Sequence, residues 1–208
     1  MPVVVLGLLA LLVGGFTVLV PVAPKDQSNV CRIFRAQPQW YDYAREAEER
    51  WGTPIATQMA FVHYESSFQS HVRPPRTRLF GFIPWVRPSS AYGYAQAQDP
   101  AWQEYLDATG DGLFVQRTQL KHAFDFIGWY NHLSHVHLGI ALTDTRQLYL
   151  AYHEGRTGFR RGSYRQKPDV SSLATRVASR AARYDRQLAE CESKLRCRHF
   201  WQFRPFCS

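Results

Sequence analysis

Apolar residues recur at helical spacing through most of the chain after residue 37. The segments with this spacing are 40–51, 54–65, 99–109, 118–137, 144–152 and 173–188. No segment shows the sustained alternation of apolar and polar residues that marks a half-buried strand. The pattern therefore predicts a mainly α fold, with at most a small hairpin.

Residues that start and stop helices flank several of these segments. Asp144 is expected to cap the helix that follows it, and Gly155 is expected to stop that helix. Residues 156–170 are basic and contain glycine and proline, so we predict a loop there. Ser171 or Ser172 is then expected to cap the last helix.

The N-terminal segment differs in kind from the rest of the chain. Val3 to Val20 is an uncharged apolar run whose length is near the lower limit for spanning a bilayer. Residues 1–23 are therefore a signal peptide or a membrane anchor, and both export the remainder. A chain of 208 residues has room for one domain of ordinary size. We divide the remainder into a linker arm (24–36), a main domain (37–170) and a C-terminal helix with a cysteine-closed tail (171–208).

The cysteines fit an exported chain, because disulfides persist in oxidising compartments. Four cysteines allow three pairings. We favour Cys31 with Cys191, which ties the arm to the last helix, and Cys197 with Cys207, which closes a short terminal loop. A zinc site is the alternative, but no two cysteines have the Cys-x-x-Cys spacing. We predict no metal ion and no cofactor.

The chain is basic, with a formal net charge of +8 and a sequence pI of about 9.5. A basic surface favours an acidic partner, such as nucleic acid, anionic lipid or an anionic cell-wall polymer. Export of the chain favours the last two partners, so we expect no nucleic acid.

Glu65 ends the apolar segment that begins at Thr53 and Pro54. Thr53 is expected to be the N-cap of this helix, with Pro54 in its first turn. Phe61 and Val62 lie one turn before Glu65, so its carboxyl group is expected beside apolar side chains. Partial burial raises the pKa of a carboxyl group and keeps a proton available near neutral pH, as a general acid requires. A lone glutamate at a helix end is more often solvated, so its neighbours decide between these interpretations.

Three segments carry the candidate chemistry: Glu65-Ser66-Ser67-Phe68, Ala91-Tyr92-Gly93-Tyr94-Ala95-Gln96 and Tyr149-Leu150-Ala151-Tyr152-His153-Glu154-Gly155. In this order they resemble the E-S-x-F, G-L-M-Q and A-Y-N-A-G elements of the lytic transglycosylases with an SLT-type, goose-lysozyme-like catalytic domain. The resemblance covers residues 37–160 and implies a lysozyme-like fold.

The resemblance also implies the roles of individual residues. Glu65 matches the single catalytic acid/base, and Tyr152 matches the tyrosine that hydrogen-bonds it. The implied substrate-binding residues are Ser66, Tyr92, Gly93, Tyr94, Gln96, Tyr152 and His153. The sequence departs from the family elements where Tyr94-Ala95 replaces Leu-Met and where His153-Glu154 replaces Asn-Ala.

The implied activity is cleavage of the β-1,4 bond between N-acetylmuramic acid and N-acetylglucosamine in peptidoglycan, with intramolecular formation of 1,6-anhydromuramic ends. Two alternatives remain open. One is a lysozyme-like hydrolase that uses Glu65 with a second carboxylate such as Glu154, although a nearby arginine is expected to hold Glu154. The other is a non-catalytic cell-wall binding protein. The implied location is the periplasm or cell envelope, with residues 3–20 as the candidate anchor to the inner membrane.

Residues 71–92 form a long segment in which proline and arginine interleave with aromatic residues. Proline at this density excludes an internal helix, so we predict a loop. Two roles remain open for it. Its rings and guanidinium groups could form a groove wall that meets sugars and peptide carboxylates, or they could form a flap that covers the protein's own core.

Overall fold

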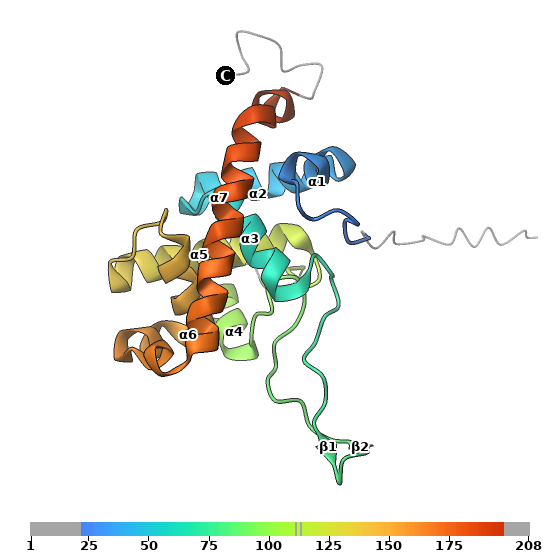
Figure 1. Cartoon of the computed structure of the whole chain (residues 1–208), viewed down its shortest axis with the longest axis vertical. Coiled ribbons are helices and arrows are strands. Elements are labelled where there is room, and N and C mark those ends of the chain that lie inside the picture. Colours follow the sequence, from blue (N-terminus) through green and yellow to red (C-terminus); the bar gives the residue numbers. More distant parts are fainter. Residues whose placement is uncertain (1–21, 111, 113, 198–208) are drawn as a thin grey trace, which may run out of the picture.

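The computed structural model describes residues 22–110, 112 and 114–197 and is mainly helical (Figure 1). The helices are α1 (Val30–Ala36), α2 (Pro38–Trp51), α3 (Ile55–Ser66), α4 (Asp99–Thr109), α5 (Leu120–Leu138), α6 (Thr145–Arg161), the short 3-10 helix η1 (Ser163–Gln166) and α7 (Pro168–Arg196). Strands β1 (Arg78–Leu79) and β2 (Ile83–Pro84) form an antiparallel hairpin between α3 and α4. The prediction of a mainly α fold with a small hairpin is confirmed.

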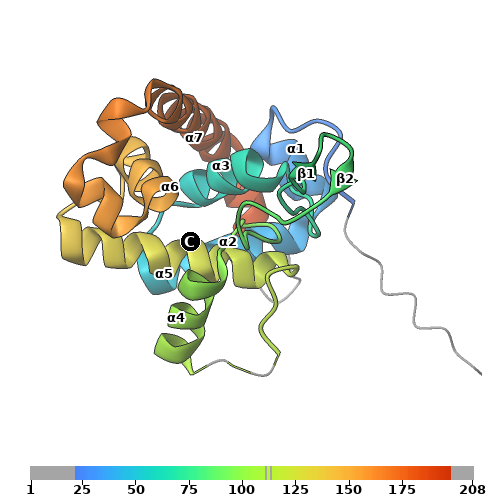
Figure 2. The same ribbon diagram turned by 90° about the horizontal axis from the view of Figure 1, so that it is seen from below.

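Helix α3 lies at the centre of the molecule. Helix α7 packs along it, and α2 and α5 contact it from other sides, as Figure 2 shows. Every residue of α3 from Ile55 to Val62 is buried. The helical spacing of Ile55, Met59 and Val62 predicts a single apolar face, but the neighbouring helices enclose α3, so its polar residues Thr57 and Gln58 are buried as well. Only the last turn, which carries Glu65, reaches partly to solvent.

The start of α3 differs from the prediction. Pro54 occupies the N-cap position, and no side-chain cap is present on it. The N–H of Ile55 instead donates to Glu48 Oε1 at 3.1 Å, so a carboxylate at the end of α2 caps α3. Thr53 is fully buried and does not cap the helix.

Residues 24–36, which the sequence presents as a linker arm, include helix α1. The Asn29 side chain accepts a hydrogen bond from the Arg32 N–H and caps this helix. Cys31 in α1 and Cys191 in α7 form a disulfide with a Cα–Cα distance of 6.1 Å. This predicted pairing is confirmed, and it fixes the arm to the long C-terminal helix.

The second predicted disulfide joins Cys197 to Cys207. Cys207 lies outside the described residues, so this pairing stays a prediction. The apolar run from Val3 to Val20 also lies outside them. Across residues 22–197, apart from 111 and 113, no helix is long and apolar enough to cross a membrane.

Helix α6 begins as predicted and ends later than predicted. The Asp144 side chain accepts from the Gln147 N–H at 3.0 Å and caps the helix. Gly155 does not stop α6; it kinks the helix with φ 74° and ψ 154°, and the helix then continues to Arg161. Glycine adopts this φ without the steric penalty of a Cβ, so the chain can bend and resume its helix. The prediction of a loop over 156–170 is therefore wrong for most of that segment.

Helix α7 begins at Pro168, before the serines that were expected to cap it. Proline suits the first turn of a helix because its fixed φ is already helical and its missing N–H needs no partner there. Ser171 and Ser172 therefore lie inside the helix, and the prediction that one of them is the cap is wrong. The sequence predicts an apolar stripe on this helix at Leu173, Val177, Ala181, Tyr184 and Leu188. The last four are buried as predicted, whereas Leu173 is partly buried and Ala174 beside it is fully buried.

Candidate active site

Glu65 lies in the last turn of α3, where the chain turns sharply out of the helix. Ser67 and Phe68 both have left-handed backbone angles, with φ of 50° and 59°. The Phe68 ring is fully buried and stacks on Trp40 at a centroid distance of 5.6 Å. The aromatic residue of the E-S-x-F element therefore anchors the turn in the core and fixes the position of Glu65.

The carboxyl group of Glu65 is partly buried among aromatic side chains. Burial raises its pKa from 4.5 to about 7, and a hydrogen bond from the Tyr149 hydroxyl acts in the opposite direction. Phe61 packs edge-on against the rings of Tyr149 and Tyr152, at centroid distances of 5.1 and 5.2 Å. Within the described part of the chain, no cation contributes to this pKa. The group can therefore carry a proton near neutral pH and can also exist as a carboxylate.

Tyr149, and not Tyr152, is the hydrogen-bond partner of Glu65. The Tyr152 hydroxyl donates to the Ala95 carbonyl at 2.6 Å, so its proton is committed to the loop after Gly93. The predicted role of Tyr152 is corrected here. The spacing of three residues between the two tyrosines places both on one face of α6, and this spacing is the feature of the sequence from which Tyr149 could have been found.

A cavity of about 300 Å³ lies against Tyr152, and neither Tyr149 nor Glu65 is among the residues that line it. Its lining consists of Gln96, Ala97, Gln98, Pro100, Ala101, Phe126, Tyr130, Tyr152, His153, Glu154 and Gly155. Phe61, one helical turn before Glu65, packs on the ring of Tyr152, so Glu65 lies near the cavity wall that Tyr152 forms. Burial chiefly, and the negative charge of Glu65 next, raise the pKa of Tyr152. The structure thus brings together three of the predicted contact residues, Gln96, Tyr152 and His153.

Gln96 is held in place by its own loop. Its side-chain Nε2 donates to the carbonyls of Val72 at 2.9 Å and Gly93 at 2.8 Å. Both amide protons are used in this way, which leaves Oε1 to accept a hydrogen bond from a ligand. Gly93 has φ 78°, and a Cβ there would lie 2.1 Å from the Arg117 carbonyl oxygen. The glycine therefore permits the close backbone approach on which the loop depends.

Glu154 is the carboxyl group that lines the cavity, and its side chain is only 3% exposed. Lys167 Nζ lies 2.9 Å from Oε2, and the hydroxyl of Ser163 also donates to that oxygen. Burial alone would raise the pKa of Glu154, but the hydrogen bonds from Ser163, Lys167 and His153 hold it below its ordinary value. The cation that pairs with Glu154 is a lysine and not the expected arginine, and the group is a fixed anion.

The family model described as the transglycosylase SLT domain matches residues 3–191. The chain belongs to this family. The match includes both cysteines of the disulfide and all three segments that carry the candidate chemistry. The mainly helical single domain is consistent with the lysozyme-like fold of SLT domains. Comparison with curated proteins and with solved structures found no match.

Two residues predicted as substrate contacts of the SLT domain lie in the interior instead. Ser66 is 5% exposed, and its hydroxyl donates to the Val62 carbonyl of its own helix. Tyr94 is 1% exposed and packs against the Trp40 ring. Both predictions are corrected, because a ligand cannot reach a buried side chain. The polar character of Ser66 and Tyr94 gave no sign in the sequence that their side chains point inward.

Tyr92 and Gly93 flank the loop of the SLT domain without lining the cavity. The guanidinium of Arg73 lies over the Tyr92 ring at 3.8 Å from its centroid. The N–H of Tyr92 donates to the Ala97 carbonyl at 3.3 Å, which closes the loop that carries Gln96. The contribution of these two residues to the cavity is therefore structural: they set the path of the loop. The lining residues Phe126 and Tyr130 on α5 were not predicted as site residues.

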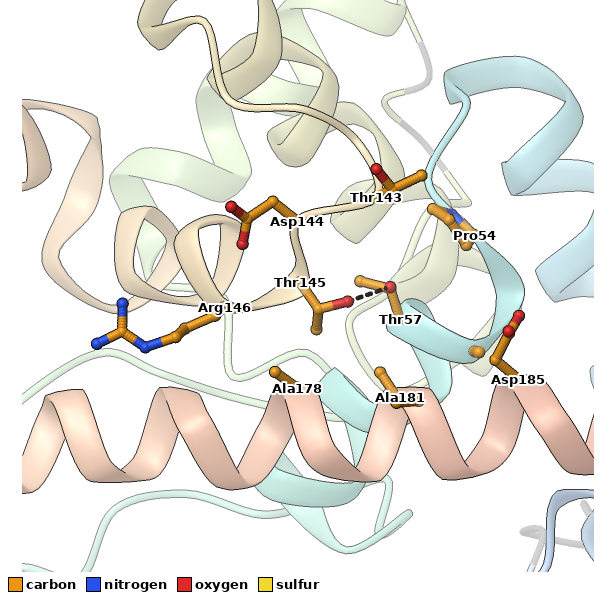
Figure 3. Close-up of a pocket in the computed structure, with 11 residues that line it drawn as sticks. Pro54, Thr57, Thr143, Asp144, Thr145, Arg146, Ala178, Ala181 and Asp185 are labelled. Atoms are coloured by element: carbon orange, nitrogen blue, oxygen red, sulfur yellow. Dashed lines mark hydrogen bonds between the residues drawn. The ribbon is translucent and has the colours of Figure 1, made fainter.

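A larger cavity, of about 480 Å³, lies at the other end of α3 between α6 and α7 (Figure 3). Thr57 and Thr145 hydrogen-bond across it at 2.7 Å, and small residues of α7 such as Ala178 and Ala181 form one wall. Its nearest lining residue on α3 is Thr57, eight residues before Glu65, which corresponds to about 12 Å of helix. No aromatic side chain lines it, so it lacks the flat apolar faces that the cavity near Glu65 offers.

Proposed function

We propose that this SLT-domain protein is a peptidoglycan lytic transglycosylase that cleaves the bond between N-acetylmuramic acid and N-acetylglucosamine, with Glu65 as the single acid/base. The observation that carries the proposal is the state of Glu65: a partly buried carboxyl group with a pKa of about 7 and no cation beside it in the described part of the chain. Such a group is available in both protonation states near neutral pH, which is what a residue with two successive roles requires.

In the first step, Glu65 acts as the acid. Its proton passes to the oxygen of the glycosidic bond as the bond to the anomeric carbon of the muramic acid breaks. The aromatic surroundings favour the neutral form of Glu65 before the step, because they cannot solvate a charge. Positioned proton transfer of this kind contributes on the order of 10²–10⁴-fold to the rate.

In the second step, the Glu65 carboxylate acts as the base. It takes the proton from the C6 hydroxyl of the same muramic acid, and that oxygen attacks the anomeric carbon to form the 1,6-anhydro ring. The hydrogen bond from Tyr149 stabilises the carboxylate between the two steps. The nucleophile belongs to the substrate, so the reaction gains from proximity and needs no activated water.

The condition of Glu154 supports a transglycosylase over a hydrolase. A hydrolase of this bond needs a second carboxylate to activate water or to attack the sugar. Glu154 is the candidate at the cavity, but Lys167 and Ser163 hold its oxygens. An anion stabilised in this way is a weak base, and both of its oxygens already accept hydrogen bonds from the protein.

The cavity supplies features that suit a sugar. Tyr152 offers a partly exposed ring for an apolar sugar surface, with the buried rings of Phe126 and Tyr130 behind it, and Gln96 offers a fixed acceptor for a hydroxyl or amide. The predicted export of the chain would place it in the periplasm or envelope, where peptidoglycan lies. The disulfide between α1 and α7 suits that compartment.

The test is mass spectrometry of the soluble products after incubation of the full chain with purified peptidoglycan. We expect anhydromuropeptides from the wild type and from Glu154→Gln, and none from Glu65→Gln. Reducing-end products that disappear in Glu154→Gln would replace the proposal with a hydrolase. Products from neither, in a folded protein that still pellets with cell wall, would make the chain a binding protein.

A further inference from the structure

The hairpin formed by β1 and β2 projects away from the helices (Figure 1) and exposes a continuous apolar segment. Exposed fractions run from 36% to 79% for its large apolar side chains: Leu79, Phe80, Phe82, Ile83, Trp85 and Val86. A contiguous group of this kind marks an interaction surface on a folded protein. The interpretation of this segment as a flap over the core is wrong, because the side chains face solvent.

The hairpin is ordered by its own hydrogen bonds. The N–H of Thr77 donates to the Val86 carbonyl at 2.9 Å, and the N–H of Trp85 donates to the Thr77 carbonyl at 2.7 Å. At the tip, Phe80 and Gly81 both have left-handed angles, with φ of 52° and 81°. This conformation is unfavourable for a bulky residue such as phenylalanine. The tip therefore holds Phe80 outward at an energetic cost, while its ring stays 79% exposed.

The charge of this region has one sign. No acidic residue occurs between Glu65 and Asp99, whereas Arg73, Arg76, Arg78 and Arg87 flank the apolar tip. The contacts found for these arginines are with a ring and with backbone carbonyls: Arg73 lies over Tyr92, Arg76 donates to the Trp85 carbonyl, and Arg87 donates to the Pro74 carbonyl. Across the described residues none of the four forms an ion pair with a carboxylate. Their positive charge is therefore available to an anionic partner.

We propose that this hairpin docks on the surface of an anionic phospholipid bilayer. Its tip would enter the boundary between headgroups and acyl chains, and its arginines would meet the lipid phosphates. Aromatic and aliphatic side chains beside arginine are the composition that binds such an interface. Leu79 and Ile83 pair across the hairpin and share one face, while Arg78 shares the other with Pro84.

A lipid surface fits this segment better than a glycan strand does. Leu79, Ile83 and Val86 have no flat ring to stack on a sugar, but they gain free energy when they leave water for a bilayer. None of the hairpin residues lines the cavity that contains Gln96 and Tyr152. The docking proposal is also independent of the chemistry at Glu65, and it concerns where the protein is held.

The test uses the full chain. Residues 3–20 are apolar enough to bind vesicles by themselves, so the measurement has to be local to the hairpin. We propose to follow trypsin cleavage after Arg76 and Arg78 with vesicles of phosphatidylglycerol mixed with phosphatidylcholine, and with phosphatidylcholine alone. Anionic vesicles are expected to slow cleavage at these two sites about tenfold relative to neutral vesicles. Cleavage after Arg186 on α7 serves as the internal reference.

A second readout is the quenching of Trp85 fluorescence by brominated lipid. It is obtained as the difference in fluorescence quenching between the wild type and Trp85→Phe. The joint change Phe80→Ser and Phe82→Ser is expected to abolish the protection from trypsin, whereas Phe114→Ser, at another exposed ring (83%), is expected to preserve it. Arg73→Gln and Arg87→Gln are each expected to weaken anionic binding about fivefold. The proposal is overturned if vesicles leave the hairpin sites and Trp85 unaffected, or if soluble glycan strands protect them and vesicles do not.

Discussion

Glu65 and Glu154 lie near the same cavity, and both have limited access to water, yet their surroundings move their pKa values in opposite directions. Glu65 has aromatic rings and one tyrosine hydroxyl around it, and burial raises its pKa to about 7. Burial acts on Glu154 too, but Ser163 and Lys167 compensate for it, and the pKa falls below its ordinary value. Burial without a cation produces a proton donor, and burial with a cation produces a structural anion.

The largest expected effect that separates the two sites is on activity. Glu65→Gln removes the only proposed proton donor, so we expect the rate of glycan cleavage to fall by about 10³-fold or more. Glu154→Gln removes a fixed anion, so we expect the rate to change by less than about tenfold. The measurement is the rate of release of soluble muropeptides at neutral pH. Equal losses in the two variants would contradict the division of roles.

The second prediction concerns stability as a function of pH. The pKa of Glu65 rises from 4.5 to about 7 on folding, so between these values the folded state keeps a proton that the unfolded state has released. The free energy of unfolding therefore falls as pH rises through this window. Glu65→Gln has no such group, so its stability relative to the wild type should increase from pH 4 to pH 8 by roughly 2–3 kcal/mol. Chemical denaturation at both pH values measures this difference, and a difference that does not change with pH would contradict the raised pKa.

The third prediction separates the two tyrosines of α6. The Tyr149 hydroxyl lowers the pKa of Glu65, so Tyr149→Phe should raise that pKa and move the alkaline limb of the pH–rate profile to higher pH. The loss of one hydrogen bond to the carboxylate should also reduce the maximal rate about tenfold. Tyr152→Phe is the matched control, because its hydroxyl donates to Ala95 and its loss should not move the limb. If the alkaline limb moved in Tyr152→Phe and not in Tyr149→Phe, Tyr152 would be the hydrogen-bond partner of Glu65, as the sequence predicted.

Much of the fold and part of the site could be predicted from the sequence. Helical spacing located most helices, Asp144 marked the start of α6 correctly, and Cys31 was paired with Cys191. Glu65 was identified because it lies in the first of three segments that resemble the family elements, and burial gives it the raised pKa that its apolar neighbours predicted. These features depend on residues close in the sequence or on a small number of cysteines.

The errors concern interactions between distant segments. Glu48 caps α3 across the turn from α2, and nothing local marks it as a better cap than Thr53. Whether Tyr94 points into the core or the cavity depends on how its loop packs on Trp40, which spacing alone does not determine. Lys167 reaches Glu154 because the chain turns back after α6, through Gly162 and η1, and brings the start of α7 beside it. A sequence pattern records none of these approaches.

The smallest expected effect lies within the surroundings of Glu154. Ser163 donates a partly buried hydrogen bond to Glu154, and Ser163→Ala leaves that carboxylate oxygen with one donor fewer to offset its burial. The free energy of unfolding should therefore fall by about 1–2 kcal/mol. The activity should be nearly unchanged, since Lys167 still holds the anion. Ser66→Ala is the matched control at Glu65, where the hydroxyl bonds its own helix and its loss should cost less. Denaturation and rate measurements on both variants test this prediction. If Ser163→Ala lowered the rate of glycan cleavage substantially while leaving the free energy of unfolding unchanged, Glu154 would have to take part in the chemistry and would not be only a support for the cavity wall.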